Sequence, residues 1–176
     1  MSSRLFILEA DDVEPFIHPA EPSYESQHIL GRETTDLHDT FLNRGRLAAG
    51  RSLGGGNHPD NTEIYVGRSG WSWLDLGGDP VTGVGSTTYR VGPESIVYIP
   101  SGTFHRLRNE GHEDYVFFTI WPEPSVEGAN GVHDERRRTW GTGFRLRAGL
   151  DLESTEDSAY VVDRAAGRTP RVSDAG

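Results

Sequence analysis

Two histidines and one glutamate, His58, Glu63 and His105, are the side chains of this sequence with the clearest chemical potential. Each lies in or beside a short strand-like segment, and side chains along a strand alternate between two faces. If these strands line one barrel, the three side chains converge inside it. Imidazole and carboxylate ligands suit Fe(II), Mn(II), Ni(II), Zn(II) or Co(II), and three protein ligands leave positions open for a substrate or O₂. The pattern therefore outlines a metal site.

The segment that must position His105 runs from Gly92 to Asn109. Its β-branched run, Ser95–Ile99, ends at Pro100, and Gly102 follows two residues later. Proline and glycine at this spacing favour a tight turn, which brings His105 onto the next strand.

The upstream segment must position the other two side chains. Gly50 precedes His58 and Glu63, and Gly70 follows them. Because strand side chains alternate, Glu63 shares a face with Tyr65. Both glycines are interpreted as turn residues without a chemical role.

The rest of the chain has a sequence pattern typical of an all-β protein, because 22 glycines and 10 prolines interrupt short apolar runs. The regular spacing predicts a sandwich or barrel. A single helical turn is predicted within Thr34–Phe41 and a short helix over Val132–Trp140. The predicted strands are Leu5–Leu8, Val13–Ile17, Ser26–Leu30, Thr62–Val66, Trp71–Leu76, Thr87–Arg90, Ser95–Ile99, Phe104–Arg108 and Tyr115–Trp121.

Composition excludes several functions. The chain of 176 residues has no cysteine, which excludes disulfides, thiolate zinc sites and a cysteine nucleophile. All 17 basic residues are arginine, so lysine Schiff-base chemistry is excluded as well. The net charge of −10 disfavours nucleic acid and anionic membranes as partners. These features predict a soluble, cytoplasmic protein with small-molecule ligands, and the arginine-rich, glycine-rich composition is typical of a bacterial host.

The two histidine-bearing segments resemble the paired motifs of the cupin superfamily. The first family motif is Gly, five residues, His-x-His, three or four residues, Glu, six residues and Gly; the second is Gly, five residues, Pro-x-Gly, two residues, His, three residues and Asn. The sequence matches the first over Gly50–Gly70, except that Gly56 stands at the first histidine. It matches the second over Pro100–Asn109, with Gly92 seven residues from the proline rather than five. The resemblance covers residues 46–121 and implies a double-stranded β-helix (cupin, or jelly-roll) barrel.

The resemblance also implies a ligand set. His58, Glu63 and His105 correspond to three metal ligands of the family, and Gly56 removes the fourth. Asp60 is a weaker candidate, because its spacing from Glu63 lies outside the family pattern. The implied cofactor is a divalent metal ion, with Fe(II) favoured over Zn, Ni or Mn. A metal-free pocket, in which the same side chains only bind a ligand, stays open as an alternative.

Other side chains are candidates for contact with a substrate. Glu63 and Tyr65 are the candidate catalytic residues, and Tyr65 is also expected to line the pocket. Arg90 is a candidate clamp for a carboxylate or phosphate, with a surface ion pair as the alternative. Trp73 and Phe118 are candidate pocket walls, with core packing as the alternative.

Three functions follow from these features. The first is a metal-dependent small-molecule enzyme, a non-heme Fe(II) oxygenase or dioxygenase that uses the His-Glu-His set. The second is a non-redox isomerase, epimerase, cyclase or lyase acting on a sugar, polyketide or other oxygenated metabolite. The third is a non-catalytic module that binds a small molecule.

The expected organisation is one barrel with extensions. Residues 1–45 are predicted to pack on the barrel, 46–125 to form it, 126–165 to close it, and 166–176 to be a flexible tail. The N-terminal segment exceeds what one barrel needs, and by analogy with cupins it predicts a homodimer.

Overall fold

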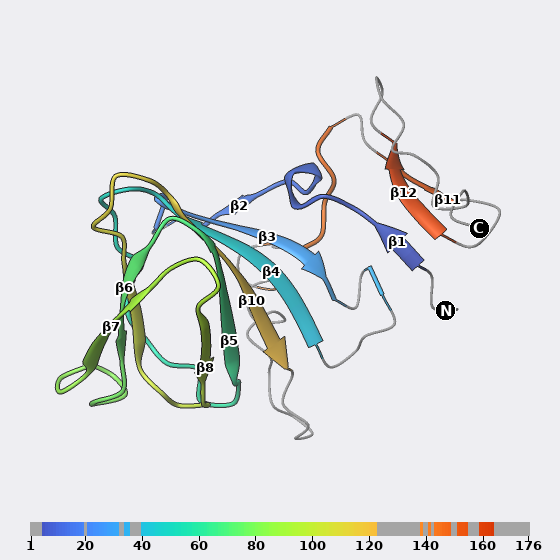
Figure 1. The fold of residues 1–176 in the computed structure, drawn as a ribbon. Coiled ribbons are helices and arrows are strands. Elements are labelled where there is room, and N and C mark those ends of the chain that lie inside the picture. Colours follow the sequence, from blue (N-terminus) through green and yellow to red (C-terminus); the bar gives the residue numbers. More distant parts are fainter. Residues whose placement is uncertain are drawn as a thin grey trace.

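The computed structural model describes residues 5–19, 21–31, 34–35, 40–122, 138, 141, 143–148, 151–154 and 159–163. Strands dominate these residues, as Figure 1 shows. The strands are β1 (Leu5–Ile7), β2 (Phe16–Ile17), β3 (Tyr24–Leu30), β4 (Thr40–Leu47), β5 (Glu63–Ser69), β6 (Ser72–Leu76), β7 (Thr87–Val91), β8 (Ile96–Ile99), β9 (His105–Arg108), β10 (Tyr115–Pro122), β11 (Asp151–Ser154) and β12 (Ala159–Asp163), with a 3₁₀ turn η1 at Ala10–Asp12.

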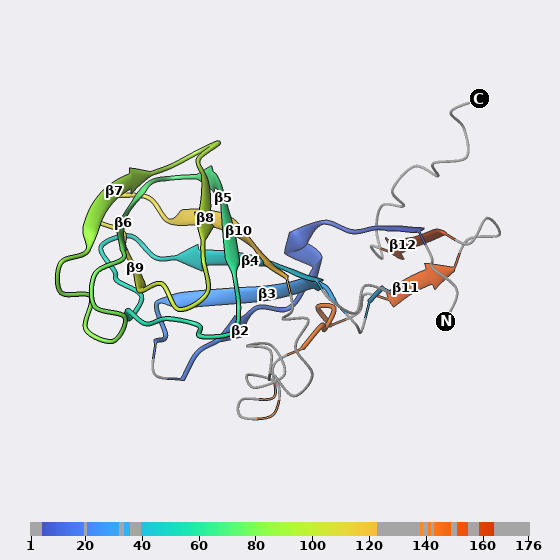
Figure 2. The same ribbon diagram turned by 90° about the horizontal axis from the view of Figure 1, so that it is seen from below.

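Two antiparallel sheets make the barrel. The larger has the strand order β2-β3-β4-β10-β5-β8, and the smaller has the order β7-β6-β9. Figures 1 and 2 show β6, β7 and β9 closing one side of the barrel. A third sheet, β1-β12-β11, lies beside the barrel rather than in it (Figure 1). The predicted all-β, double-stranded β-helix architecture is confirmed.

Alternation of side chains builds the core. Along β10, buried and half-buried residues alternate from Tyr115 to Pro122 without a break. This is the period-two pattern of a strand with one face toward the interior. The core gathers large apolar side chains from both sheets, including Leu47, Leu74, Ile99, Leu107, Tyr115 and Phe117.

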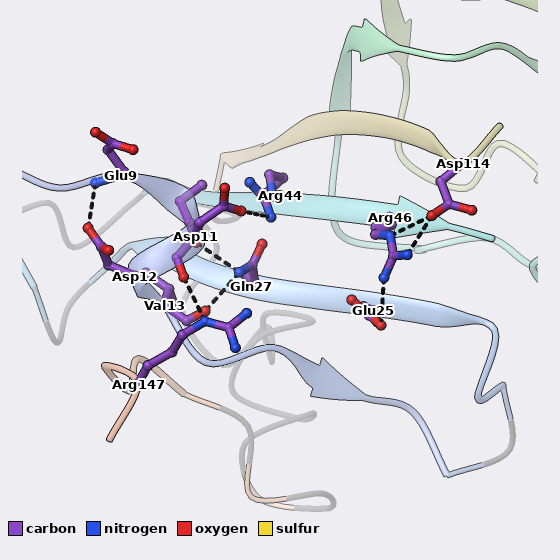
Figure 3. Close-up of polar contacts among 11 residues, drawn as sticks. Glu9, Asp11, Asp12, Val13, Glu25, Gln27, Arg44, Arg46, Asp114 and Arg147 are labelled. Carbon is purple, nitrogen blue, oxygen red and sulfur yellow. Dashed lines mark hydrogen bonds and ion pairs between the residues drawn. The ribbon is translucent and has the colours of Figure 1, made fainter. Parts of the chain in front are cut away.

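Polar contacts fix the N-terminal segment to the outer face of β3 and β4 (Figure 3). The Gln27 side chain donates hydrogen bonds to the carbonyls of Ala10 and Val13, at 2.8 and 2.7 Å. Arg44 on β4 forms an ion pair of 2.6 Å with Asp11. Gln27 and Arg44 point away from the barrel interior, so the opposite faces of these strands are left to line it.

The sequence underestimated the contribution of residues before 46. Ser26–Leu30 was expected as a strand, and β3 begins two residues earlier at Tyr24. β4 was not predicted as a full strand, yet it pairs along its whole length with β10. Within Thr34–Phe41, the amides of Thr34 and Thr35 both bind the carbonyl of Gly31, and β4 has already begun at Thr40.

The end of the chain differs from the expectation as well. No strand was predicted after residue 121, but β11 and β12 form an antiparallel pair, and β12 pairs in parallel with β1. Apart from Arg138, the helix expected over Val132–Trp140 lies outside the described residues, as does the tail over 166–176. The part of the chain that the structure describes contains no helix with the length and apolar character needed to cross a membrane.

Candidate metal centre

A hydrogen-bonded turn places His105 at the start of β9. The amide of Thr103 binds the carbonyl of Pro100 at 3.2 Å, and Gly102 has a φ of 72°. This φ is strained for residues with a side chain, which explains the glycine. The Gly102 amide also donates to the carbonyl of His58 at 2.8 Å. The same turn therefore ties the two histidine-bearing segments together.

Glu63 is the first residue of β5 and is buried, with 2% of its surface exposed. It pairs with Ile99 on β8, the residue that precedes the turn at Pro100. Tyr65 lies two residues further on the same inward face and is equally buried. Alternation along β5 thus places both side chains inside the barrel, as the sequence predicted.

The three predicted ligands come together in the interior. Nε2 of His105 lies 3.3 Å from Oε2 of Glu63, and Nε2 of His58 lies 4.0 Å from the same oxygen. One ligand atom from each residue can be chosen so that all lie within 4.8 Å of one another. Glu63 is the first residue of β5, His58 precedes this strand, and His105 is the first residue of β9. The group therefore contains residues from both sheets of the barrel.

The hydrogen bond at the other ring nitrogen of His105 decides what this group can bind. Nδ1 lies 3.0 Å from the backbone carbonyl of Thr103. A carbonyl can only accept, so Nδ1 carries the proton, and in the neutral ring Nε2 presents a lone pair. That lone pair faces the Glu63 carboxylate, and either a proton on Nε2 or a metal cation beside the two groups satisfies both acceptors. A backbone carbonyl behind the distal nitrogen is also the usual support for a metal-ligating histidine. The donor set fits a divalent metal ion.

Gly56 lies directly opposite His105. The two residues form an antiparallel bridge, with the His105 amide bound to the Gly56 carbonyl at 2.9 Å. Residues paired in this way project to the same face of a sheet. A Cβ built on Gly56 meets no atom within 4 Å. A side chain at position 56 would therefore enter open space on the His105 side, where the family motif has its first histidine.

A cavity of about 320 Å³ contains this group. Its walls come from β3, β5, β9 and β10 and from the glycine-rich segment before His58. The residues that line it are Phe16, His18, Glu21, Tyr24, Ser26, His28, Leu53, Gly54, Gly55, Gly56, His58, Glu63, Tyr65, His105, Arg106, Leu107 and Trp121.

The structure brings some of the predicted site residues into this cavity and leaves others outside. Tyr65 lines it, and its ring packs edge-on against His105 with centroids 6.2 Å apart. Among the described lining residues, Trp73, Arg90 and Phe118 do not appear. Arg90 instead lies over the ring of Trp71 at 4.7 Å.

Asp60, the weaker candidate ligand, is exposed and lies outside the group of His58, Glu63 and His105. Asn109 has a structural role, because its side-chain amide donates to the carbonyls of Leu47 and Glu113.

Several lining residues were not singled out from the sequence. Trp121 packs against His58 with ring centroids 4.8 Å apart. Tyr24, Ser26 and His28 were not among the predicted site residues, although they occupy alternate positions on β3. Period-two spacing along the predicted strand Ser26–Leu30 was the signal that could have placed Ser26 and His28 on one face.

Comparison with known proteins identifies the fold. No family model and no curated protein matches the sequence. A solved structure from Thermotoga maritima, described as a predicted oxalate decarboxylase, is 19% identical with a TM-score of 0.56, covering 66% of this chain and 98% of that one. A double-stranded β-helix protein from Klebsiella pneumoniae is 15% identical with a TM-score of 0.52, covering 68% and 90%. A variant of Bacillus subtilis oxalate decarboxylase is 17% identical with a TM-score of 0.55, covering 68% and 30%.

These likenesses show the fold of the protein. The chain has the cupin fold, and His58, Glu63 and His105 in its interior form a group that could hold a metal ion.

Proposed function

We propose that the protein is a metal-dependent enzyme acting on a small molecule, and specifically a non-heme Fe(II) oxygenase. The observation that carries the proposal is the orientation of His105, whose Nε2 faces the Glu63 carboxylate while Nδ1 is held by the Thr103 carbonyl. Two histidines and one carboxylate are the ligand set of non-heme Fe(II) oxygenases. Gly56 supports this choice, because it contributes no fourth protein ligand.

The residues of the chain have distinct roles in this proposal. His58, Glu63 and His105 hold the ion, which when bound supplies redox chemistry and charge stabilisation. Tyr65, buried beside His105, orients the substrate and holds a proton at its hydroxyl. Trp121 covers His58 and limits the access of water.

Non-redox chemistry is the second candidate. Tyr65 and His28 line the same cavity as Glu63, and all three can hold or release a proton. This arrangement suits an isomerase, epimerase, cyclase or lyase, in which Glu63 or a histidine is the general base. Fe(II) content with substrate-dependent O₂ uptake supports the oxygenase; turnover with zinc or manganese and no O₂ uptake supports the second candidate.

Metal analysis of protein purified without a chelating tag tests the proposal. We expect about one equivalent of iron, and we expect His105→Ala to lower metal affinity at least about tenfold, since even the outer partners of metal ligands are worth 10–100-fold. The circular dichroism spectrum should be unchanged. Asp60→Ala is the matched control and should retain metal. Equal metal content in wild type and His105→Ala, or no binding of any divalent metal, would contradict the assignment.

The small-molecule partner, the homodimer and the cytoplasmic location stay predictions. Sedimentation equilibrium tests the dimer directly: a monomer mass at micromolar protein concentration would exclude a stable one.

A further inference from the structure

The cavity has a second polar wall, on β3. Tyr24, Ser26 and His28 occupy alternate positions of this strand and all three line the cavity. The residue between Ser26 and His28 is Gln27, which points the other way and binds the N-terminal segment (Figure 3). The inward face of β3 thus carries two polar side chains, Ser26 and His28, although it faces the interior of the barrel.

Ser26 is the informative residue of this wall. Only 3% of its surface is exposed, and its Oγ has no hydrogen-bond partner among the described residues. A buried hydroxyl without a partner costs free energy, so native structures rarely keep one without a reason. Because the hydroxyl lines the cavity, a ligand in the cavity can provide that partner.

The β3 wall and the metal centre lie in different parts of the cavity. In the larger sheet, β4 and β10 separate β3 from β5. Neighbouring strands lie about 4.8 Å apart, so three steps place the backbones of β3 and β5 about 14 Å apart along the sheet, and its curvature brings their inward side chains closer. A ligand that contacts both must carry one group for the metal centre and another group at its far end.

The charges around the cavity limit which group a ligand can carry at its far end. Arg106 is the one arginine among the described lining residues, and it is bound to Asp75 by an ion pair of 2.8 Å. Arg106 also alternates with His105 along β9, so it points out of the barrel. Glu21 adds a negative charge to the lining. Among the described residues that line the cavity, no guanidinium is therefore available to pair with a carboxylate or a phosphate.

We propose that Ser26 and His28 form a specificity-determining subsite for a neutral hydroxyl or carbonyl oxygen at the far end of the substrate. The substrate class is then a small oxygenated molecule that binds the metal centre through one end and is uncharged at the other. Phosphorylated sugars and dicarboxylates fall outside this class. The subsite gives the proposed function its substrate class and rests on that function only for the metal-binding end of the ligand.

Three catechols that differ only in the far substituent test the proposal. The probes are 4-propylcatechol, 4-(2-hydroxyethyl)catechol and 3,4-dihydroxyphenylacetate, titrated by calorimetry into zinc-loaded and metal-free protein. We expect the hydroxyethyl probe to bind about fivefold more tightly than the propyl probe, the effect of one added hydrogen bond. The acetate probe should bind most weakly, because it buries an unpaired charge.

Ser26→Ala should abolish the difference between the hydroxyethyl and propyl probes and leave zinc content and propyl binding unchanged. Ser69→Ala, an exposed serine at the end of β5, is the control and should behave as wild type. Ser26→Ala removes a hydroxyl without a partner, so its melting temperature should not fall. A difference that survives in Ser26→Ala, tightest binding of the acetate probe, or no binding of any probe would overturn the proposal.

The two proposals fail in distinguishable ways. If zinc does not bind but the order of the three probes persists in metal-free protein, the metal-dependent function fails and the subsite stands. If zinc binds stoichiometrically but the probes show no order, the subsite fails and the metal centre stands.

Discussion

Glu63 and Asp75 are both buried carboxylates, each with 3% of its side chain exposed, but the barrel surrounds them differently. Glu63 points inward from β5 and Asp75 points outward from β6. Burying a carboxylate is costly unless partners compensate it. The partners therefore indicate what each carboxylate is for.

Asp75 is compensated by groups that hold it permanently ionised. It accepts hydrogen bonds from Arg106 and Arg108 on β9 and from Thr88 on β7, at 2.9, 3.1 and 2.6 Å. Burial raises its pKa, but the hydrogen bonds from Arg108, Thr88 and Arg106 outweigh burial and lower the pKa to about 2. Asp75 sits on the middle strand of the smaller sheet and fastens both neighbouring strands to it.

Glu63 has imidazoles where Asp75 has guanidiniums. His58 and His105 can be neutral, and the neutral His105 presents a lone pair to the carboxylate. A guanidinium is always charged and completes a structural site, whereas a neutral imidazole leaves a lone pair free for a metal ion. The comparison separates a carboxylate that stabilises the fold from one that we propose binds a metal ion.

Substituting each carboxylate by its amide is the most direct test of whether Asp75 and Glu63 have different roles. We expect Asp75→Asn to lower the free energy of unfolding by about 3 kcal/mol at pH 7, because it leaves two arginines beside a neutral group. Glu63→Gln in metal-free protein should leave that free energy unchanged or raise it, since functional sites are seldom optimised for stability.

Urea denaturation of both variants provides the measurement. Metal content should show the reverse pattern, with Glu63→Gln losing metal and Asp75→Asn retaining it. A loss of stability in Glu63→Gln as large as that in Asp75→Asn would remove the distinction between the two sites.

Acid should lower the free energy of unfolding, because it protonates Asp75. Its folded pKa of about 2 lies below the ordinary value of 3.8, so its stabilising contribution is complete above about pH 4. As the pH falls from about 4 to about 2, protonation removes a contribution of about 2 kcal/mol. The difference in unfolding free energy between wild type and Asp75→Asn, measured at pH 5 and pH 2.5, should shrink by that amount.

Asp60→Asn, a change at an exposed carboxylate, is the control and should follow wild type at both pH values. A constant difference between wild type and Asp75→Asn across this range would mean that the arginines do not hold Asp75 ionised.

Much of the barrel could be predicted because its strands alternate and its turns carry glycine and proline. β8, β9 and β10 lie within one residue of their predicted positions, and β5 begins one residue later and ends three residues later than predicted. The inward positions of His58, Glu63 and His105 followed from the same alternation, and the resemblance to the cupin motifs marked these three residues as candidate ligands. Local sequence was enough here because one face of each strand is apolar or carries the site.

β4 shows where local sequence fails. Its residues 43–46, Asn-Arg-Gly-Arg, have poor strand propensity. The strand forms because it lies between β3 and β10 and pairs with both. Arg44 and Arg46 on its outer face are compensated by Asp11, Glu25 and Asp114 (Figure 3), contacts that are distant in sequence. Alternation could place Ser26 and His28 on one face of β3, but only the assembled sheet shows that this face lines the cavity.

Gly56→His tests whether Glu63 belongs to a metal site. A Cβ at this position meets no atom within 4 Å, and the bridge to His105 directs the side chain to the face that His105 occupies. A third imidazole near Glu63 should raise affinity for Zn(II) about tenfold, which corresponds to about 1.4 kcal/mol. Competition with a chromophoric chelator measures the change.

Gly54→His is the matched control, because Gly54 also lines the cavity but lies two residues before Gly56 and outside the bridge to His105. It should leave zinc affinity unchanged. The expected gain in zinc affinity requires that the imidazole at position 56 and the side chains of His58, Glu63 and His105 all bind the same ion. An unchanged affinity in a folded Gly56→His protein would therefore place the ion, and with it the functional role of Glu63, somewhere other than between His58 and His105.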